Sequence, residues 1–356
     1  MATIHNGILW YDQNQTPVSA LGGCLLEDHG TYYLFGEYRY TNKLTFTGFS
    51  RYTSTDLEHW TYTGLALPPQ PEGLLGPDRI GDRVKVVRAQ TTGEAIMLMH
   101  TDDIRTFDPC VGFATAERLD DTFRFQGPMC YHGEPIRMWH IGTFTDTDGT
   151  NYLLTHEGDI YRLAPDGHSI AAQVASNIAP GTEASAMFRM HDTYFFIASH
   201  KTSWERNDNL YFSAPTISGP WTNHGPFCPP GTLTFDSQTA FVFMLATQYG
   251  SVPMYMGDRR SIPDQIASTH VWLPLLVSGQ KLSIPNYWQA WNPQTGKPTE
   301  KPTIIPLIWH EETPNSGITF AFHGRRLTLW GSSGPHNGYA KITLTTPEGK
   351  VLQQVL

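Results

Sequence analysis

Short apolar segments bounded by turn residues recur along most of the chain. One pattern returns five times: a turn containing Gly or Asp, followed by a run of aromatic and aliphatic residues. The copies are Gly30–Glu37, Gly93–His100, Gly149–His156, Asp192–His200 and Gly250–Asp258. Helical periodicity is hard to find, and Gly and Pro interrupt most windows long enough for a helix, so these runs predict β-strands.

Further strand-like segments flank each copy of the pattern. Those before it are Leu21–Glu27, Val84–Ala89, Ile141–Asp146, Ala184–Met190 and Thr239–Ala246, and those after it are Phe49–Ser54, Val111–Ala116, Asp159–Leu163, Asn209–Ala214 and Ser268–Leu273. Three units continue into a Trp- or Phe-bearing segment: LEHWTYTG, DTFRFQG and GPWTNHG. Units of about four strands, repeated every 40 to 60 residues or so, are typical of a β-propeller. We therefore predict an all-β fold whose residues 1–292 form a five-bladed β-propeller.

The repeat ends near residue 290, where a polar, Pro-containing linker begins. Beyond it, Gly317–Phe322, Arg326–Gly331 and Tyr339–Thr345 alternate like strands. About 55 residues are few for an independent β-sandwich. Residues 293–356 are therefore predicted to be a linker followed by a small C-terminal β domain or extension, a partial β-sandwich.

Composition narrows the class of partner. The 356-residue chain has a net charge of −9 and no basic run, which argues against nucleic acid or an anionic membrane. Its 10 Trp and 16 Tyr suit stacking on sugar rings or packing between sheets. The four cysteines match no metal spacing, so free thiols are expected. The N-terminus lacks a signal peptide, so we expect a cytoplasmic protein, or a secreted one if a leader was trimmed. The oligomeric state stays open.

The first strand of each propeller blade lines the central channel, so residues near the starts of these strands should converge. They are Ala20 or Leu21, Asp82, His140, Glu183 and Gln238, and four of the five positions are polar. We predict a polar pocket at one mouth of the channel. Alternatively, strand starts are polar simply because they leave a loop.

The second strands end alike, in Glu37, His100, His156, His200 and Asp258. The histidines could line the channel, hold a structural cation such as calcium, or pack and form hydrogen bonds. No metal ligand is assigned, and no cofactor is required by the chemistry below.

Glu183 opens an otherwise apolar segment, where burial raises the pKa of a carboxyl group and favours a proton donor. An inverting glycosidase pairs such an acid with a base that activates water. The first blade offers Ala20, Leu21, Gly22 and Gly23 at the matching place, and none of these can accept a proton.

Several longer motifs carry a family resemblance. They are LGGCLLEDHGTYYLFGEYRY, YTSTDLEHWTYTGLAL, DRVKVV with LMHTDD, TFTDTDGTNYLL, EASAMF, and FDSQTAFVF with YMGDRR and VWLPL. Together they resemble glycoside hydrolase family 43, and within it the exo-β-1,3-galactanase group. The resemblance implies that Glu183 is the general acid and that Gln238 replaces the base, orienting water as an amide or as its imidic acid tautomer. Two positions depart from that group: Asp82 stands in place of a glutamate, and His140 in place of an aspartate.

The sequence therefore predicts an inverting, exo-acting glycoside hydrolase for β-galactosides, β-1,3-galactan or a related neutral oligosaccharide or polysaccharide. Glu183 and Gln238 are the expected catalytic residues; Asp82, His140, Glu37, Trp139, Trp204 and Tyr38 are expected to bind substrate. One alternative is a catalytically silent propeller that binds glycans. Another is an α-arabinofuranosidase or β-xylosidase, although these family members use the aspartate base that the first blade lacks.

Overall fold

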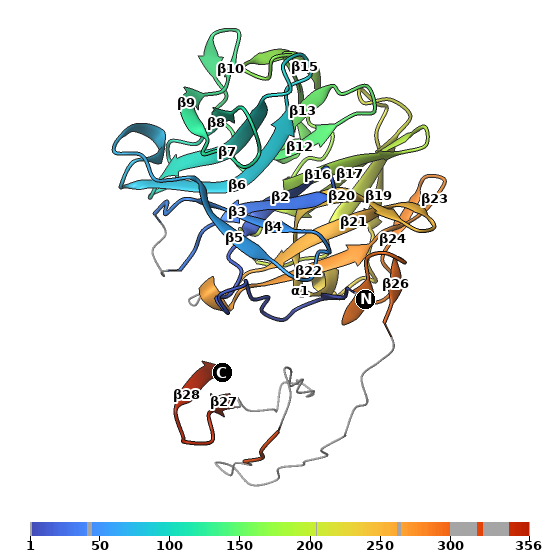
Figure 1. Ribbon diagram of the computed structural model, residues 1–356. Coiled ribbons are helices and arrows are strands. Elements are labelled where there is room, and N and C mark those ends of the chain that lie inside the picture. The colour runs from blue at the N-terminus through green and yellow to red at the C-terminus, as the bar shows by residue number, and fades with distance from the viewer. Residues whose placement is uncertain are drawn as a thin grey trace. The chain divides into compact units, whose positions relative to one another are not determined.

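The computed structural model describes residues 2–40, 45–203, 205–261, 265–299, 319–322 and 342–355. The chain divides into two compact units, Met1–Glu300 and Lys301–Leu356. Nearly every described element is a strand, which confirms the predicted all-β class (Figure 1). Among the described residues, the one α-helical segment, α1 (Leu233–Asp236), is a short turn whose residues have positive φ. No helix in the described ranges is long and apolar enough to cross a membrane.

Five antiparallel sheets follow one another in the first unit, each made of consecutive strands. They are β2 (Leu21–Asp28), β3 (Thr31–Glu37), β4 (Phe49–Ser54) and β5 (Thr61–Leu67); β6 (Arg79–Arg88), β7 (Ala95–Asp103), β8 (Cys110–Ala116) and β9 (Arg124–Pro128); β12 (Gly142–Thr145), β13 (Asn151–Leu154), β14 (Ile160–Leu163) and β15 (Ile170–Ala175); β16 (Thr182–Met190), β17 (Thr193–His200), β18 (Leu210–Ala214) and β19 (Thr222–Pro226); and β20 (Gln238–Thr247), β21 (Gly250–Arg259) and β22 (Thr269–Pro274). These bounds agree with the predicted segments to within a few residues, and β15 is the strand that the sequence pattern missed.

Neighbouring side chains on the second strands point to opposite faces of each sheet, as strand geometry requires. Because both faces are apolar, the core divides into five clusters, each lying between two sheets. The pairs are the first and second sheets (Phe35, Met97), second and third (Leu98, Leu153), third and fourth (Leu154, Phe196), fourth and fifth (Phe195, Val271), and fifth and first (Met254, Leu34). The last of these clusters packs the fifth sheet against the first.

Short strands tie the N-terminal segment to the end of the same unit. β1 (Ile4–His5) pairs with β25 (Ala290–Asn292), which pairs with β26 (Lys297–Pro298). Trp291 is fully buried there and donates its indole N–H to the carbonyl of Trp272 at 2.8 Å. Two further hairpins are small: β10 (Cys130–Tyr131) with β11 (Glu134–Pro135), and β23 (Leu276–Ser278) with β24 (Lys281–Ser283).

The first strands of the five sheets lie side by side. β2 contacts β6 and β20, β16 contacts β12 and β20, and β12 contacts β6. Polar residues near the starts of these strands are therefore brought to one end of the unit. All four cysteines are free thiols, and Cys24, Cys110 and Cys228 are buried.

In the second unit, β27 (Ile342–Thr345) pairs with β28 (Val351–Val355). β27 corresponds to the end of the strand predicted at Tyr339–Thr345. The predicted strand Arg326–Gly331 lies outside the described residues, as do the first two residues of Gly317–Phe322. The described residues 319–322 form no strand, so that prediction is wrong for them.

Replacing Phe195 by Ala should destabilise the first unit by about 3–5 kcal/mol, because a buried Phe leaves a cavity that the surroundings fill only in part. Phe195 is fully buried and stacks on Phe188 with ring centroids 5.0 Å apart. Urea unfolding would measure the change. The matched control is Phe107→Ala, since Phe107 is 79% exposed and its loss should cost within about 0.5 kcal/mol. Equal effects of the two changes would contradict this packing.

Candidate active site

The backbone is kinked near the start of each first strand. Arg83, His140, Ala184 and Asp236 have φ of 53°, 53°, 54° and 62°, in the left-handed region that L-residues avoid. Register shifts accompany two of them, between Asp82 and Lys85 and between Glu183 and Ala186. Each such residue costs on the order of 1–3 kcal/mol, and such strain concentrates at functional sites.

Glu183 lies on β16 and is 4% exposed. Its Oε1 is 3.4 Å from Nε2 of Gln238, and its Oε2 is 3.6 Å from Nδ1 of His140. Burial raises the pKa of Glu183 to about 7, although the nearby Arg83 cation and the Gln238 hydrogen bond oppose the rise. The structure thus holds a carboxyl group that retains its proton up to about neutral pH, where it is half protonated.

Gln238, the first residue of β20, is buried and has partners at both ends of its amide. Its Nε2 donates to Oγ of Ser199 at 3.0 Å and to the carbonyl of Ser203 at 2.9 Å, besides the contact with Glu183. Its Oε1 accepts a hydrogen bond from Nη2 of Arg83. The acid and the amide are therefore direct neighbours.

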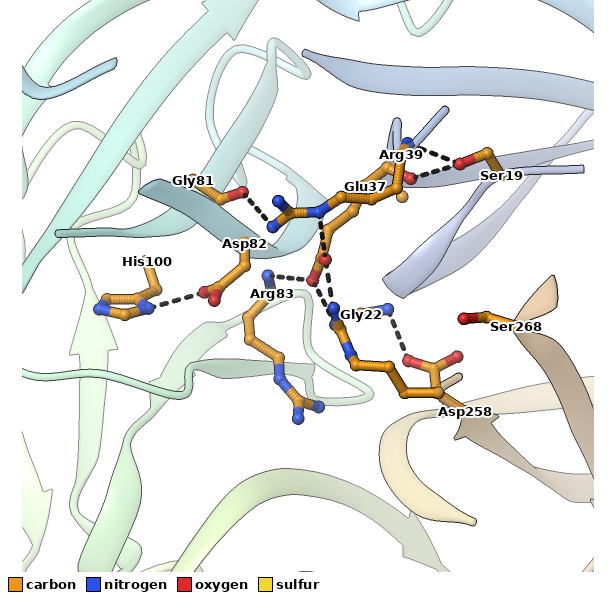
Figure 2. A network of polar contacts seen from close by, with 12 residues as sticks. Ser19, Gly22, Glu37, Arg39, Gly81, Asp82, Arg83, His100, Asp258 and Ser268 are labelled. Carbon is orange, nitrogen blue, oxygen red and sulfur yellow. Dashed lines mark hydrogen bonds and ion pairs between the residues drawn. The ribbon is translucent and has the colours of Figure 1, made fainter. Parts of the chain in front are cut away.

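Arg83 was not predicted as a site residue, yet it occupies the centre of this network. It is buried, its Nη1 donates to the carbonyl of Thr239 at 2.9 Å, and its backbone N–H donates to Glu37 at 3.2 Å. Figure 2 shows its guanidinium pointing away from Glu37. The only sequence signal was its place directly after Asp82 in DRVKVV.

Asp82 is paired with a histidine (Figure 2). Nδ1 of His100 lies 2.6 Å from Asp82, and Nε2 of His100 lies 3.6 Å from Asp102. Burial disfavours charge on both partners, but their mutual attraction outweighs it. The pKa of Asp82 is held well below its usual range and that of His100 is raised to about 9. Asp82 is therefore ionised at neutral pH and can only accept hydrogen bonds.

His140 lies beside Glu183, with its ring centroid 6.4 Å from that of His100. It is 9% exposed, and its Nδ1 is buried without a hydrogen-bond partner. Burial and the positive charge of Arg83 lower the pKa of His140 well below its ordinary value. The imidazole is therefore neutral, with a free polar atom beside the acid.

Glu37, predicted to bind substrate, is 1% exposed and its oxygens already have protein partners. One oxygen accepts from Arg39 at 3.1 Å and from Arg260 at 3.0 Å, and the other from the Arg83 backbone (Figure 2). It holds three cationic residues in place around the site.

The structure explains why the first sheet carries no base. Gly22 has φ of +60°, and a Cβ at this position would collide with the carboxylate of Glu37. Its N–H donates to Asp258 at 2.5 Å, and its carbonyl accepts from Lys85 at 2.7 Å. A carboxylate side chain has no room there.

The aromatic residues predicted to bind substrate differ in their surroundings. Trp139 is half-buried and stacks on His156 at 3.7 Å, with the ammonium of Lys201 5.4 Å from its ring. Tyr38 packs against Tyr40 and Tyr62 at centroid distances of 4.7 and 5.9 Å. Trp204 lies outside the described residues. One face of Trp139 is thus already covered.

The prediction that three histidines end the second strands in register is wrong. His100 pairs with Asp82, but His200 pairs with Thr182 rather than with Glu183, and this one-residue offset leaves His200 exposed. His156 lies beyond β13, in the single turn η2 (His156–Gly158). Among the described residues, no group of three or more His, Cys, Asp or Glu is placed to hold a metal ion.

Comparison with known proteins finds structural relatives over most of the chain. No family model and no curated sequence matches. The exo-β-1,3-galactanase of Phanerochaete chrysosporium, solved with β-1,3-galactotriose, is 30% identical with a TM-score of 0.77, over 82% of this chain and 68% of that one.

Two other solved structures point the same way. A candidate exo-β-1,3-galactanase of Bifidobacterium bifidum s17 is 31% identical with a TM-score of 0.72, over 78% of this chain and 95% of that one. A family 43 β-1,3-galactosidase is 27% identical with a TM-score of 0.73, over 82% of this chain and 63% of that one. With this identity and coverage, the chain belongs to glycoside hydrolase family 43.

Proposed function

We propose that the chain is an inverting, exo-acting glycosidase that removes terminal galactose from β-1,3-linked galactosides. The observation that carries the proposal is the buried carboxyl group of Glu183, whose pKa is raised to about 7 and which is hydrogen-bonded to Gln238. The sugar, the linkage and the exo mode come from the names of the relatives, a β-1,3-galactosidase and exo-β-1,3-galactanases.

The proposal includes the architecture: the five consecutive sheets are the blades of a five-bladed propeller, within a catalytic domain of residues 1–292. Two observations support it. The first strands contact one another in the cyclic order β2, β6, β12, β16, β20 and back to β2. The fifth core cluster packs the last sheet on the first.

Cleavage begins with a proton donor at the glycosidic oxygen. Glu183 gives its proton to that oxygen as the bond between it and the anomeric carbon breaks. Since burial raises its pKa to about 7, a large fraction of the carboxyl group is still protonated near neutral pH and can act as an acid. The leaving sugar departs with the proton as a free hydroxyl.

A water molecule completes the reaction. Its oxygen forms a bond to the anomeric carbon from the opposite face while one of its hydrogens is directed to Oε1 of Gln238. The surplus proton passes to solvent, from which Glu183 is reprotonated. Hydrolysis therefore needs no cofactor.

Two polar residues are suited to hold hydroxyl groups of the terminal sugar. Asp82 is ionised and accepts hydrogen bonds, and His100 fixes its direction. His140 presents a buried Nδ1 without a protein partner, 3.6 Å from the acid. A buried polar atom without a partner costs free energy until a ligand or water satisfies it.

Replacing Glu183 by Gln should lower the kcat for β-1,3-galactobiose by at least about 10²-fold, since general acid catalysis supplies about 10²–10⁴-fold. Binding of the disaccharide should persist, because the amide keeps the shape of the carboxyl group. Galactose release and titration calorimetry would measure the two quantities. The control Glu27→Gln changes an exposed carboxylate on β2 and should leave kcat unchanged.

Two outcomes would count against the proposal. Undiminished turnover by the Glu183→Gln variant would remove Glu183 from the mechanism. Disaccharide binding by the unaltered chain, without any product, would instead support a glycan-binding module.

The same variant should be more stable than the unaltered chain at high pH. The folded pKa of Glu183, about 7, lies above its ordinary 4.5, so its stabilising contribution is present below pH 4.5 and is lost as pH rises to 7. The stability gained by Glu183→Gln should therefore be larger at pH 8.5 than at pH 4.5, by about 2–3 kcal/mol. Urea unfolding at both pH values tests this, and an equal gain at both would contradict it. Exposed Glu72→Gln serves as the control.

A further inference from the structure

The amide of Gln238 could in principle face either way, and its neighbours decide between the two orientations. An arginine carries only donors, so the atom that contacts Arg83 must be the amide oxygen. A backbone carbonyl only accepts, so the atom 2.9 Å from the carbonyl of Ser203 must be the amide nitrogen. Both neighbours therefore require Oε1 to face Arg83 and Nε2 to face Glu183.

The opposite orientation would disable the water site. If Oε1 faced Glu183, the protonated carboxyl group would donate to it, and the amide would hold the acid's proton instead of a water molecule. Without Arg83, the carbonyl of Ser203 would oppose this flip with a single neutral hydrogen bond. The guanidinium of Arg83 provides a charge-assisted bond, which is roughly twice as strong as a neutral one.

Arg83 is itself held rigidly. Its two terminal nitrogens bond to consecutive residues of β20, the side chain of Gln238 and the carbonyl of Thr239. Its own backbone N–H is fixed by Glu37. A planar fork can make both terminal bonds at once, whereas the single ammonium of a lysine cannot match that geometry.

We propose that Arg83 is a positioning residue that fixes Gln238 as an amide, with Oε1 turned away from Glu183, so that this oxygen holds the attacking water. The inference rests on the proposed function. The inference also decides between the two tautomers of Gln238. In the imidic acid, Oε1 carries a proton, and a cation bonded to Oε1 disfavours that proton. Arg83 therefore stabilises the amide.

Arg83 acts on the acid through its charge as well. It lies within electrostatic range of Glu183, as does the cation Lys201, and also of the neutral His140 and the anions Asp82 and Asp258. Its positive charge favours the ionised form of Glu183. Removing that charge should therefore keep the acid protonated to higher pH.

A double-mutant cycle with β-1,3-galactobiose tests the proposal. Arg83→Met should lower kcat about 10²-fold, the loss expected when a reacting group is misplaced by about 1 Å. KM should change little. Combining Arg83→Met with Gln238→Ala should lower kcat no further than Gln238→Ala does, to within about twofold, because residues that act as a unit are not additive.

The pH profile supplies a readout that a purely structural role would not move. On the basic side, kcat/KM of the unaltered chain should fall near pH 7, and Arg83→Met should move this fall to higher pH. Arg83→Lys keeps the charge, so it should leave the pH of the fall unchanged while still lowering kcat. The matched control is Arg51→Lys, because Arg51 is also buried and bonds to backbone carbonyls, those of Leu119 and Asp121, away from Glu183. It should leave both kcat and the pH of the fall unchanged.

Additive losses in the cycle, or an unchanged kcat in Arg83→Met, would overturn the inference while leaving the proposed function intact. Absence of hydrolysis by the unaltered chain would overturn the proposed function, and the inference with it. Thermal unfolding checks that each variant folds. If Arg83→Met does not fold, the same cycle run with Arg83→Lys decides by the same criterion.

Discussion

The site depends on how buried charges are neutralised. Ionisable groups removed from water must be paired or must give up their charge. Glu37 is paired with Arg39 and Arg260, and Asp82 with His100. Glu183 faces a neutral imidazole and an amide instead, so it gives up its charge by retaining a proton. Of the three carboxyl groups Glu37, Asp82 and Glu183, Glu183 is the one without a bonded cation, and it is the one that the chemistry requires as an acid.

The fold supplies both the burial and the strain that this arrangement needs. Apolar residues on both faces of the sheets lock the first strands side by side, and the polar residues near their starts then share one small region. Kinks at Arg83, His140 and Ala184 accompany these residues, at a cost in backbone energy that the packed sheets offset. The same crowding excludes a carboxylate at Gly22, so activation of water falls to Gln238 on the proposed mechanism.

Much of this could be predicted from sequence, because strands and their order follow from local patterns. Counting strand starts identified Asp82, His140, Glu183 and Gln238. The structure places Glu183 in short contact with His140 and Gln238, and Asp82 within electrostatic range of His140. β15 was missed because its sequence, IAAQVA, is half alanine and contains no aromatic residue, unlike the neighbouring strands.

The misses at the site have a common physical cause. The place of His200 depends on a register offset of one residue, which no local pattern encodes. Arg83 and the partners of Glu37 depend on side chains that meet from strands distant in sequence. The stack of Trp139 on His156 is likewise a tertiary contact.

The central claim is that one sugar binds at Glu183 and Gln238, with Glu183 as the proton donor and Oε1 of Gln238 directing the attacking water. A crystal of the unaltered chain soaked with galactose tests it most directly. The account predicts galactose with its anomeric hydroxyl within hydrogen-bond reach of Glu183 or of Oε1 of Gln238, and with His140 contacting another hydroxyl. Galactose bound at a site remote from both residues, with Arg83 no longer bonded to Gln238, would contradict it.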